Sequence, residues 1–158
     1  MIVHAARAGA QAPRARDSLP TADLTWPLLT VQGERRTLEQ FRGQVLVINS
    51  WATWCEPCVA ELRTFAALRS AIPDRGLVFA LIASQRREPV AAFTRRRGVT
   101  LPVYLAAAHA PASFRLDAVP TTWLVDRRGR IVLRHRGAAN WDTPEVRARL
   151  RALLDEAP

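Results

Sequence analysis

The feature that most constrains the fold is an apolar run that leads directly into a pair of cysteines. Val45–Ile48 is continuous, apolar and rich in β-branched side chains, which is typical of a central strand covered on both faces. Cys55 and Cys58 come next, and apolar residues then recur at helical spacing over Val59–Ile72. Pro73–Gly76 supplies a helix-ending signal. This order predicts a buried strand, a turn and a helix that begins at the cysteines.

The remaining patterns alternate between strand and helix, and 158 residues suit one domain with a single core. We expect an edge strand at Asp23–Val31, because Pro27 interrupts it, and further strands at Leu77–Ala83, Val99–Leu105, Thr121–Val125 and Arg130–Leu133. Helix patterns cover Glu88–Arg97, Ala110–Asp117 and the segment after Thr143. We therefore expect a disordered tail at 1–18 and one α/β domain at 19–158.

The two cysteines are the only ones in the chain, and their spacing suits thiol chemistry. Disulfide exchange needs one thiolate that attacks and a second thiol that resolves the mixed disulfide. A helix start favours the thiolate of Cys55, because unpaired N–H groups and the helix dipole stabilise an anion there. Pro57 suits the first helical turn since it has no N–H, whereas the charge of Glu56 slightly opposes deprotonation of Cys55. The pattern predicts a redox-active Cys55–Cys58 couple.

The segment Asn49–Cys58, Asn-Ser-Trp-Ala-Thr-Trp-Cys-Glu-Pro-Cys, resembles the active-site segment of the thioredoxin superfamily, and within it that of the TlpA/ResA/CcmG-like branch. The resemblance extends from about Leu24 to the C-terminal helix. It implies a thioredoxin fold: a central mixed β-sheet flanked by helices, with an N-terminal β extension and an inserted helix within Ser84–Val103. We also expect Trp54 to be partly exposed and to form a contact surface around the active site.

A second stretch, Ala118–Trp123, resembles the cis-proline loop of the same family. The resemblance implies that Pro120 is cis and packs beside the active-site disulfide. It also implies that the backbone at Val119, together with Thr121, helps to dock the substrate chain.

Glu61 lies one helical turn after Cys58, where members of the branch carry an acidic residue that handles protons for the buried cysteine. A solvated helix glutamate is an equal alternative for this position. Asn49 occupies the place where thioredoxin has a buried aspartate, so that proton carrier is absent. Its absence strengthens the role that the resemblance implies for Glu61.

Two other functions stay open for the same cysteines. The pair could carry copper or zinc with an outside ligand, although no second close ligand pair is formed by the three histidines, His4, His109 and His135. A peroxiredoxin-like peroxidase would want threonine or serine three residues before Cys55, and this chain has Ala52 there. We expect no metal and no cofactor other than the Cys55–Cys58 disulfide.

The formal net charge of +9 comes entirely from arginine, since the chain has no lysine. Arg95–Arg97 and Arg127–Arg130 are the clusters that nucleic acid could use. One cluster ends a predicted helix, where cations are favourable, the other occupies a hairpin turn, and no aromatic residues interleave with them. We therefore expect solvated faces, weak attraction to acidic partners or anionic lipid, and no nucleic-acid partner.

Together these observations predict a protein thiol–disulfide oxidoreductase, in the direction of a reductase, of the cytochrome c maturation or metal-site assembly type. By resemblance, apocytochrome c or a copper-site protein is the natural client, and a membrane thiol donor recycles the couple. We expect a monomer. Residues 1–18 lack the apolar core of a signal peptide. A periplasmic or membrane-anchored location would therefore use a leader absent from this sequence, and a cytoplasmic location is the alternative.

Overall fold

The computed structural model describes residues 19–158, so the tail expected at 1–18 lies outside the described residues. A seven-stranded mixed sheet forms the centre, in the order β2-β1-β5-β4-β3-β6-β7. Its strands are β1 (Leu28–Thr30), β2 (Arg35–Arg36), β3 (Val45–Trp51), β4 (Leu77–Ala83), β5 (Val103–Ala106), β6 (Thr121–Val125) and β7 (Ile131–Arg136).

The predicted central strand is the most buried part of the sheet. Every residue of β3 is buried, because β4 pairs with it in parallel on one side and β6 antiparallel on the other. Successive residues of a strand point to opposite faces of the sheet. Val45, Val47 and Trp51 therefore enter the core on one face of the sheet, and Leu46 and Ile48 enter the core on the other.

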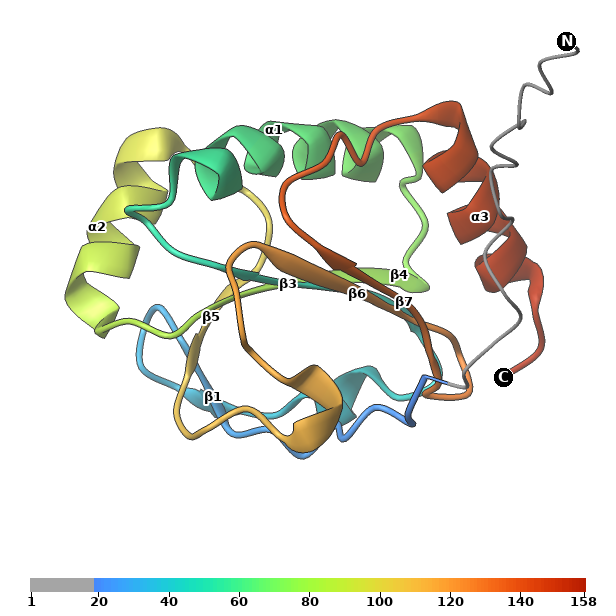
Figure 1. Cartoon of the computed structure of the whole chain (residues 1–158), viewed down its shortest axis with the longest axis horizontal. Helices are drawn as coiled ribbons and strands as arrows, with labels where there is room; N and C mark the ends of the chain where they lie inside the picture. The colour runs from blue at the N-terminus through green and yellow to red at the C-terminus, as the bar shows by residue number, and fades with distance from the viewer. Residues whose placement is uncertain (1–18) are drawn as a thin grey trace, which may run out of the picture.

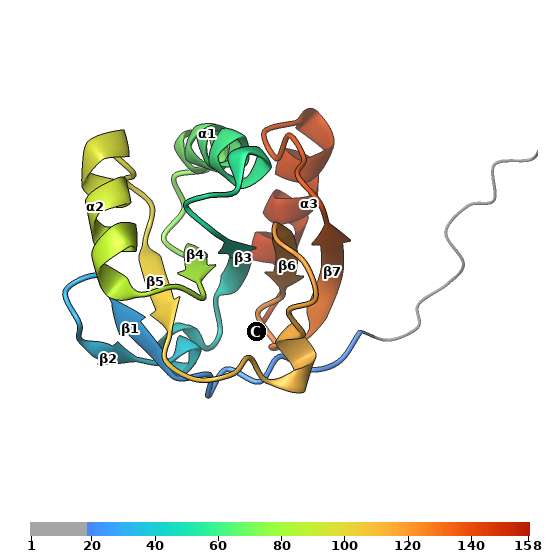
Figure 2. The same ribbon diagram turned by 60° about the vertical axis from the view of Figure 1, so that its left-hand side comes forward.

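Three helices cover one face of the sheet: α1 (Glu56–Ala71), α2 (Arg87–Arg97) and α3 (Pro144–Asp155) (Figures 1 and 2). Each contributes buried apolar side chains to the core on that face: Leu62, Phe65 and Leu68 from α1, Val90 and Phe93 from α2, and Leu150 and Leu153 from α3. Helix α2 lies between β4 and β5 in the chain, which confirms the inserted helix. None of the helices in residues 19–158 is long and apolar enough to cross a bilayer.

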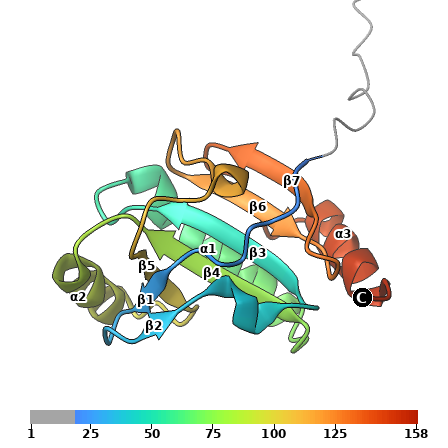
Figure 3. The same ribbon diagram turned by 90° about the horizontal axis from the view of Figure 1, so that it is seen from below.

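The opposite face carries no α-helix within the described residues and is covered by irregular chain (Figure 3). Its cover consists of the segment before β1 and two short 3-10 helices, η1 (Leu38–Phe41) and η2 (Ala112–Phe114). Trp26 stacks there on the ring of Phe114 and Trp123 meets that ring edge-on, with ring centroids 5.9 and 5.7 Å away. This second core holds the N-terminal β extension against the sheet.

Three expected elements are shorter than the sequence indicates, and one of them, the strand expected at Val99–Leu105, is regular only over β5. The strand expected at Asp23–Val31 is regular only over β1, and β1 is not an edge strand, because β2 pairs outside it. The helix expected at Ala110–Asp117 is reduced to the single turn η2. Backbone groups just before it are bonded to the N-terminal segment instead: Ala107 N–H donates to the carbonyl of Pro27, and the Trp26 indole N–H donates to that of Ala108. Within the expected helix itself, the Ser113 hydroxyl accepts from the Asp23 amide at 3.0 Å, so this stretch too is tied to the N-terminal segment.

Candidate active site

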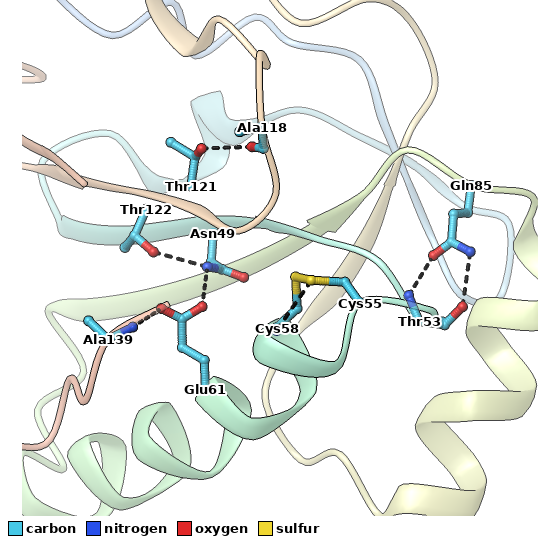
Figure 4. The surroundings of a disulfide bond; sticks show 10 residues. All are labelled: Asn49, Thr53, Cys55, Cys58, Glu61, Gln85, Ala118, Thr121, Thr122 and Ala139. Atoms are coloured by element: carbon cyan, nitrogen blue, oxygen red, sulfur yellow. Dashed lines mark hydrogen bonds between the residues drawn. A yellow bond between two sulfur atoms is a disulfide. The ribbon is translucent and has the colours of Figure 1, made fainter. Parts of the chain in front are cut away.

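The two cysteines lie at the start of helix α1, just after the central strand β3. Cys55 is the N-cap of α1, with extended backbone, and its sulfur accepts a hydrogen bond from the Cys58 amide at 3.3 Å. The two residues form a disulfide, with Cα atoms 5.3 Å apart (Figure 4). Cys55 retains 7% exposure and Cys58 none. Of the two cysteines, only Cys55 therefore keeps some surface in contact with solvent, and Cys58 is fully enclosed.

The rest of the motif faces solvent. Trp54 is 72% exposed, the most exposed large apolar side chain of the described residues. Glu56 and Pro57 occupy the first turn of α1 and are exposed as well. An exposed indole beside the accessible sulfur offers a flat apolar contact for an approaching protein chain.

The turn that carries Trp54 is fixed by a side chain from a different strand end. Gln85, just after β4, accepts a hydrogen bond from the Thr53 amide and donates one to the Thr53 hydroxyl, both at 2.9 Å (Figure 4). This pair ties the chain before Cys55 to the loop before α2. Sequence reasoning missed Gln85, because nothing local marks a residue whose partner lies 32 positions away.

The loop expected to dock substrate lies beside the cysteine segment. The Val119–Pro120 peptide bond is cis. Because β3 and β6 run antiparallel, with Ser50 opposite Thr121, the chain entering β6 lies next to the chain leaving β3 for Cys55. Thr121 is buried, and its hydroxyl donates to the carbonyl of Ala118 at 2.7 Å (Figure 4). Val119 is half-buried and packs against the same core cluster as the cysteines.

Glu61 is buried rather than solvated, with only 2% exposure. Three donors converge on its carboxylate: Asn49 Nδ2 and the Ala139 amide, each at 3.2 Å, and the indole N–H of Trp141. Burial raises the pKa of Glu61 above its ordinary value of 4.5, and the hydrogen bonds from Trp141, Ala139 and Asn49 oppose that rise. The site thus places a buried carboxyl with a raised pKa one turn along α1 from Cys58.

Trp141 and Thr122 are site residues that sequence reasoning did not find. Trp141 reads as a packing residue in the sequence, and it does stack on Phe65 at a centroid distance of 5.6 Å. It also donates to Glu61 from 80 positions away, and Thr122 accepts from Asn49 Nδ2 at 2.9 Å. Only the folded sheet brings these partners together.

An open groove of about 1030 Å³ is lined in part by Gln85, the residue that hydrogen-bonds to Thr53 before the cysteines. Alanines line much of its floor, and Arg86, His109 and Arg115 line it as exposed polar groups. Within residues 19–158, no group of three or more His, Cys, Asp or Glu side chains is placed to hold a metal ion.

Comparison with known proteins places this arrangement in a family. A family model described as Redoxin matches residues 7–150. The thioredoxin-like protein YneN of Bacillus subtilis is 30% identical over 107 residues, which cover 66% of this chain and 63% of that protein. The thiol-disulfide oxidoreductase ResA of Geobacillus kaustophilus is 26% identical over 106 residues, which cover 66% and 61%. The chain thus matches less than two thirds of the length of these curated relatives.

The fold is shared with solved structures. A protein from Chlorobium tepidum described as the thiol:disulfide interchange protein DsbE superposes with a TM-score of 0.73 at 21% identity, over 87% of this chain and 99% of that one. The central mixed sheet and the helices that flank it confirm the thioredoxin fold expected from the sequence. The chain belongs to the redoxin family, and the relatives it is similar to include proteins named as thiol-disulfide oxidoreductases, as the resemblance to the TlpA/ResA/CcmG-like branch predicts.

Proposed function

We propose that this protein reduces disulfide bonds in other proteins through the Cys55–Cys58 couple. The observation that carries the proposal is the difference between the two sulfurs: Cys55 caps the N-terminus of α1 and is reachable, whereas Cys58 is fully buried one turn below it. A thiolate at a helix N-terminus is stabilised by the dipole and by free N–H groups. Cys55 is therefore the nucleophile and Cys58 the resolving thiol.

The reaction runs in two exchanges. The Cys55 thiolate attacks one sulfur of the client disulfide, forms a mixed disulfide and releases the other client sulfur as a thiolate that takes up a proton. Cys58 then loses its proton and attacks Cys55, which releases the second client thiolate and closes the Cys55–Cys58 disulfide. Two electrons pass from the dithiol to the client. Glu61 accepts the proton that Cys58 gives up, because it is the buried carboxyl one turn along the same helix.

The client chain docks around Cys55. Trp54, Glu56 and Pro57 form the exposed contact surface, and the backbone at Val119, Pro120 and Thr121 guides the client strand past the disulfide. The groove beside Gln85 extends this surface, and its Arg86, Arg115 and His109 favour an acidic client segment. No cofactor beyond the disulfide is needed for this chemistry.

The client class that best suits the family resemblance is an apocytochrome c or a protein that acquires copper, outside the cytoplasm. A membrane thiol donor would reduce the Cys55–Cys58 disulfide after each cycle, and the protein would act as a monomer. Expression of the chain with its natural upstream sequence, fused to a reporter that is active only outside the cytoplasm, tests the location. A reporter active only in the cytoplasm would contradict it.

Client trapping tests the proposed reaction. In a Cys58→Ser variant the mixed disulfide cannot be resolved, so a reduced Cys55 should accumulate covalently bound client that dithiothreitol releases. Cys55→Ser is the matched control and should trap at least tenfold less, because its remaining thiol is buried. Equal trapping by both variants would contradict the assignment of Cys55 as nucleophile.

Salt-dependent kinetics test the docking groove. Peptide disulfides flanked by Asp and Glu should be reduced several times faster than those flanked by Arg, and the advantage should fade with rising salt. Arg115→Gln should lose part of that advantage, whereas Arg128→Gln, in the hairpin turn between β6 and β7, should keep it. If both variants lose it equally, the preference reflects overall charge and the groove has no part in it.

A further inference from the structure

The side chain of Asn49 has one polar atom without a partner in a place where such atoms are rare. Asn49 is fully buried, and its oxygen Oδ1 has no hydrogen-bond partner within the described residues. Its nitrogen is fully used, because Nδ2 donates to Thr122 at 2.9 Å and to Glu61 at 3.2 Å. Buried polar groups in native proteins nearly always have partners, so an orphaned oxygen calls for an explanation.

The direction of this oxygen follows from the chemistry of its neighbours. An ionised carboxylate can only accept hydrogen bonds, so the amide nitrogen of Asn49 must face Glu61. The oxygen is then turned the other way, and Figure 4 shows it directed toward the disulfide, on the side of Cys58. Along β3, Asn49 is two residues from Val47 and two from Trp51, so its side chain faces the same side of the sheet as theirs. Val47 and Trp51 share a core cluster with Cys58. The orphaned acceptor and the buried sulfur therefore lie on the same face of the sheet.

The disulfide explains why Asn49 Oδ1 accepts no hydrogen bond from the described part of the chain. Neither sulfur of a disulfide carries a proton, so the sulfur of Cys58 has no hydrogen to donate in this structure. When the couple is reduced, Cys58 becomes a fully buried thiol and gains an S–H donor. That donor needs an acceptor, and Asn49 Oδ1 is a buried acceptor without another partner on the facing strand.

We propose that Asn49 is a positioning residue whose Oδ1 accepts the S–H proton of Cys58 in the dithiol state. The inference rests on the proposed cycling of the couple between disulfide and dithiol. The hydrogen bond keeps Cys58 neutral and fixes its sulfur while Cys55 carries the negative charge. Because the same amide donates to Glu61, it links the resolving thiol to the carboxyl that takes its proton. No bond is made or broken at Asn49 itself.

The groups that can titrate around this hydrogen bond are few and identifiable. Cys55 and Glu61 face it from α1. His135 of β7 meets the ring of Trp141 edge-on at a centroid distance of 5.5 Å, and its charge lowers the pKa of Glu61. Thr122 of β6 is polar but does not ionise in this range. A titration of Cys58 must therefore be made with Cys55 removed and must allow for Glu61.

Infrared spectroscopy of the S–H stretch gives a test that leaves Asn49 intact. A Cys55→Ser variant has Cys58 as its single thiol, and the S–H band lies in a spectral window free of other protein bands. The proposal predicts a band at the lowered frequency of a hydrogen-bonded thiol. A band at the frequency of a free thiol would overturn the proposal, even if the unmodified protein reduces client disulfides normally.

Substitution at Asn49 then identifies the acceptor. In the Cys55→Ser background, Asn49→Leu should move the S–H band to the free-thiol frequency and lower the pKa of Cys58 by about one unit, because the neutral thiol loses its acceptor. Thr122→Val is the matched control: it removes the other partner of Nδ2, leaves Oδ1 in place and should change neither value. A pKa of Cys58 that stays the same or rises in Asn49→Leu would overturn the proposal.

Discussion

Glu61 shows how single residues obtain their properties in this molecule. Its carboxylate comes from the second turn of the active-site helix, and its donors come from β3 and from the segment after β7. The carboxyl is almost completely buried, so its ionised form is less favourable than in water. The donors recover part of that cost, and the balance leaves the pKa of Glu61 above 4.5.

This balance predicts a pH-dependent stability. An acid whose pKa is higher in the folded state binds more protons when folded, so the free energy of unfolding falls as pH rises from about 4.5 through the folded pKa. Glu61→Gln cannot ionise and should lose this slope. Urea unfolding of the oxidised protein between pH 4 and 8 measures it. Parallel pH profiles for the two proteins would contradict the account.

A second prediction concerns Trp141. Trp141→Phe keeps an aromatic ring on Phe65 but removes the N–H donor to Glu61, so the pKa of Glu61 should rise further. A pH titration of the Glu61 carboxyl ¹³C chemical shift by NMR measures this pKa directly. Trp51→Phe is the control, because the buried indole N–H of Trp51 has no partner among residues 19–158, and that substitution should leave the Glu61 titration unchanged. An equal shift in both variants would assign the effect to packing.

The sequence located some of these residues and not others, for a physical reason. Cys55 and Cys58 lie on one local strand–turn–helix pattern, which periodicity and spacing can reveal. Glu61 is indicated only by the resemblance to the TlpA/ResA/CcmG-like branch, with a solvated glutamate as the equal alternative. Gln85, Thr122 and Trp141 act through partners that the sheet brings near from distant positions. Their contacts depend on register and topology, and a single sequence carries no local signal for either.

Among the elements, those with strong local signals agree best with the sequence. β4 covers the predicted Leu77–Ala83, and α3 begins after the predicted Thr143, whose hydroxyl accepts from the Val146 amide at 3.3 Å. Elements whose bounds depend on tertiary partners differ: β5 is shorter than Val99–Leu105, and Ser113, inside the helix expected at Ala110–Asp117, is bonded to Asp23 of the N-terminal segment. Local propensity decides where packing does not compete.

The C-terminal end of α2 is closed by a glycine, and substitution there should change the stability of the protein. Gly98 adopts the left-handed conformation, with φ of 60°, and the amides of Gly98 and Val99 close the helix onto Arg95 and Thr94. A Cβ at Gly98 would meet no heavy atom within 4 Å, so Gly98→Ala tests the backbone alone. It should lower the free energy of unfolding by about 1 kcal/mol. Arg96→Ala in the last turn should change it by less than about 0.5 kcal/mol. Equal values for the two would contradict the left-handed cap.

At the scale of the whole molecule, the mixed sheet builds the site. β3 is central and runs parallel to β4, so Cys55 emerges at the carboxyl edge of the sheet, where open α/β folds form their sites. The antiparallel β6 returns Pro120 to the same edge, and the chain after β7 brings Trp141 to Glu61. Helix α1 then buries Cys58 while leaving Cys55 accessible.

The most direct test of this account is a redox titration of the Cys55–Cys58 couple in dithiol buffers, followed by the fluorescence of the nearby tryptophans. The account predicts a reversible two-electron transition near or below the roughly −270 mV of thioredoxin, as expected for a reductase. A potential near about −120 mV would contradict the reducing direction and indicate disulfide formation. The absence of any reversible transition would contradict the thiol–disulfide function itself and favour the metal carrier.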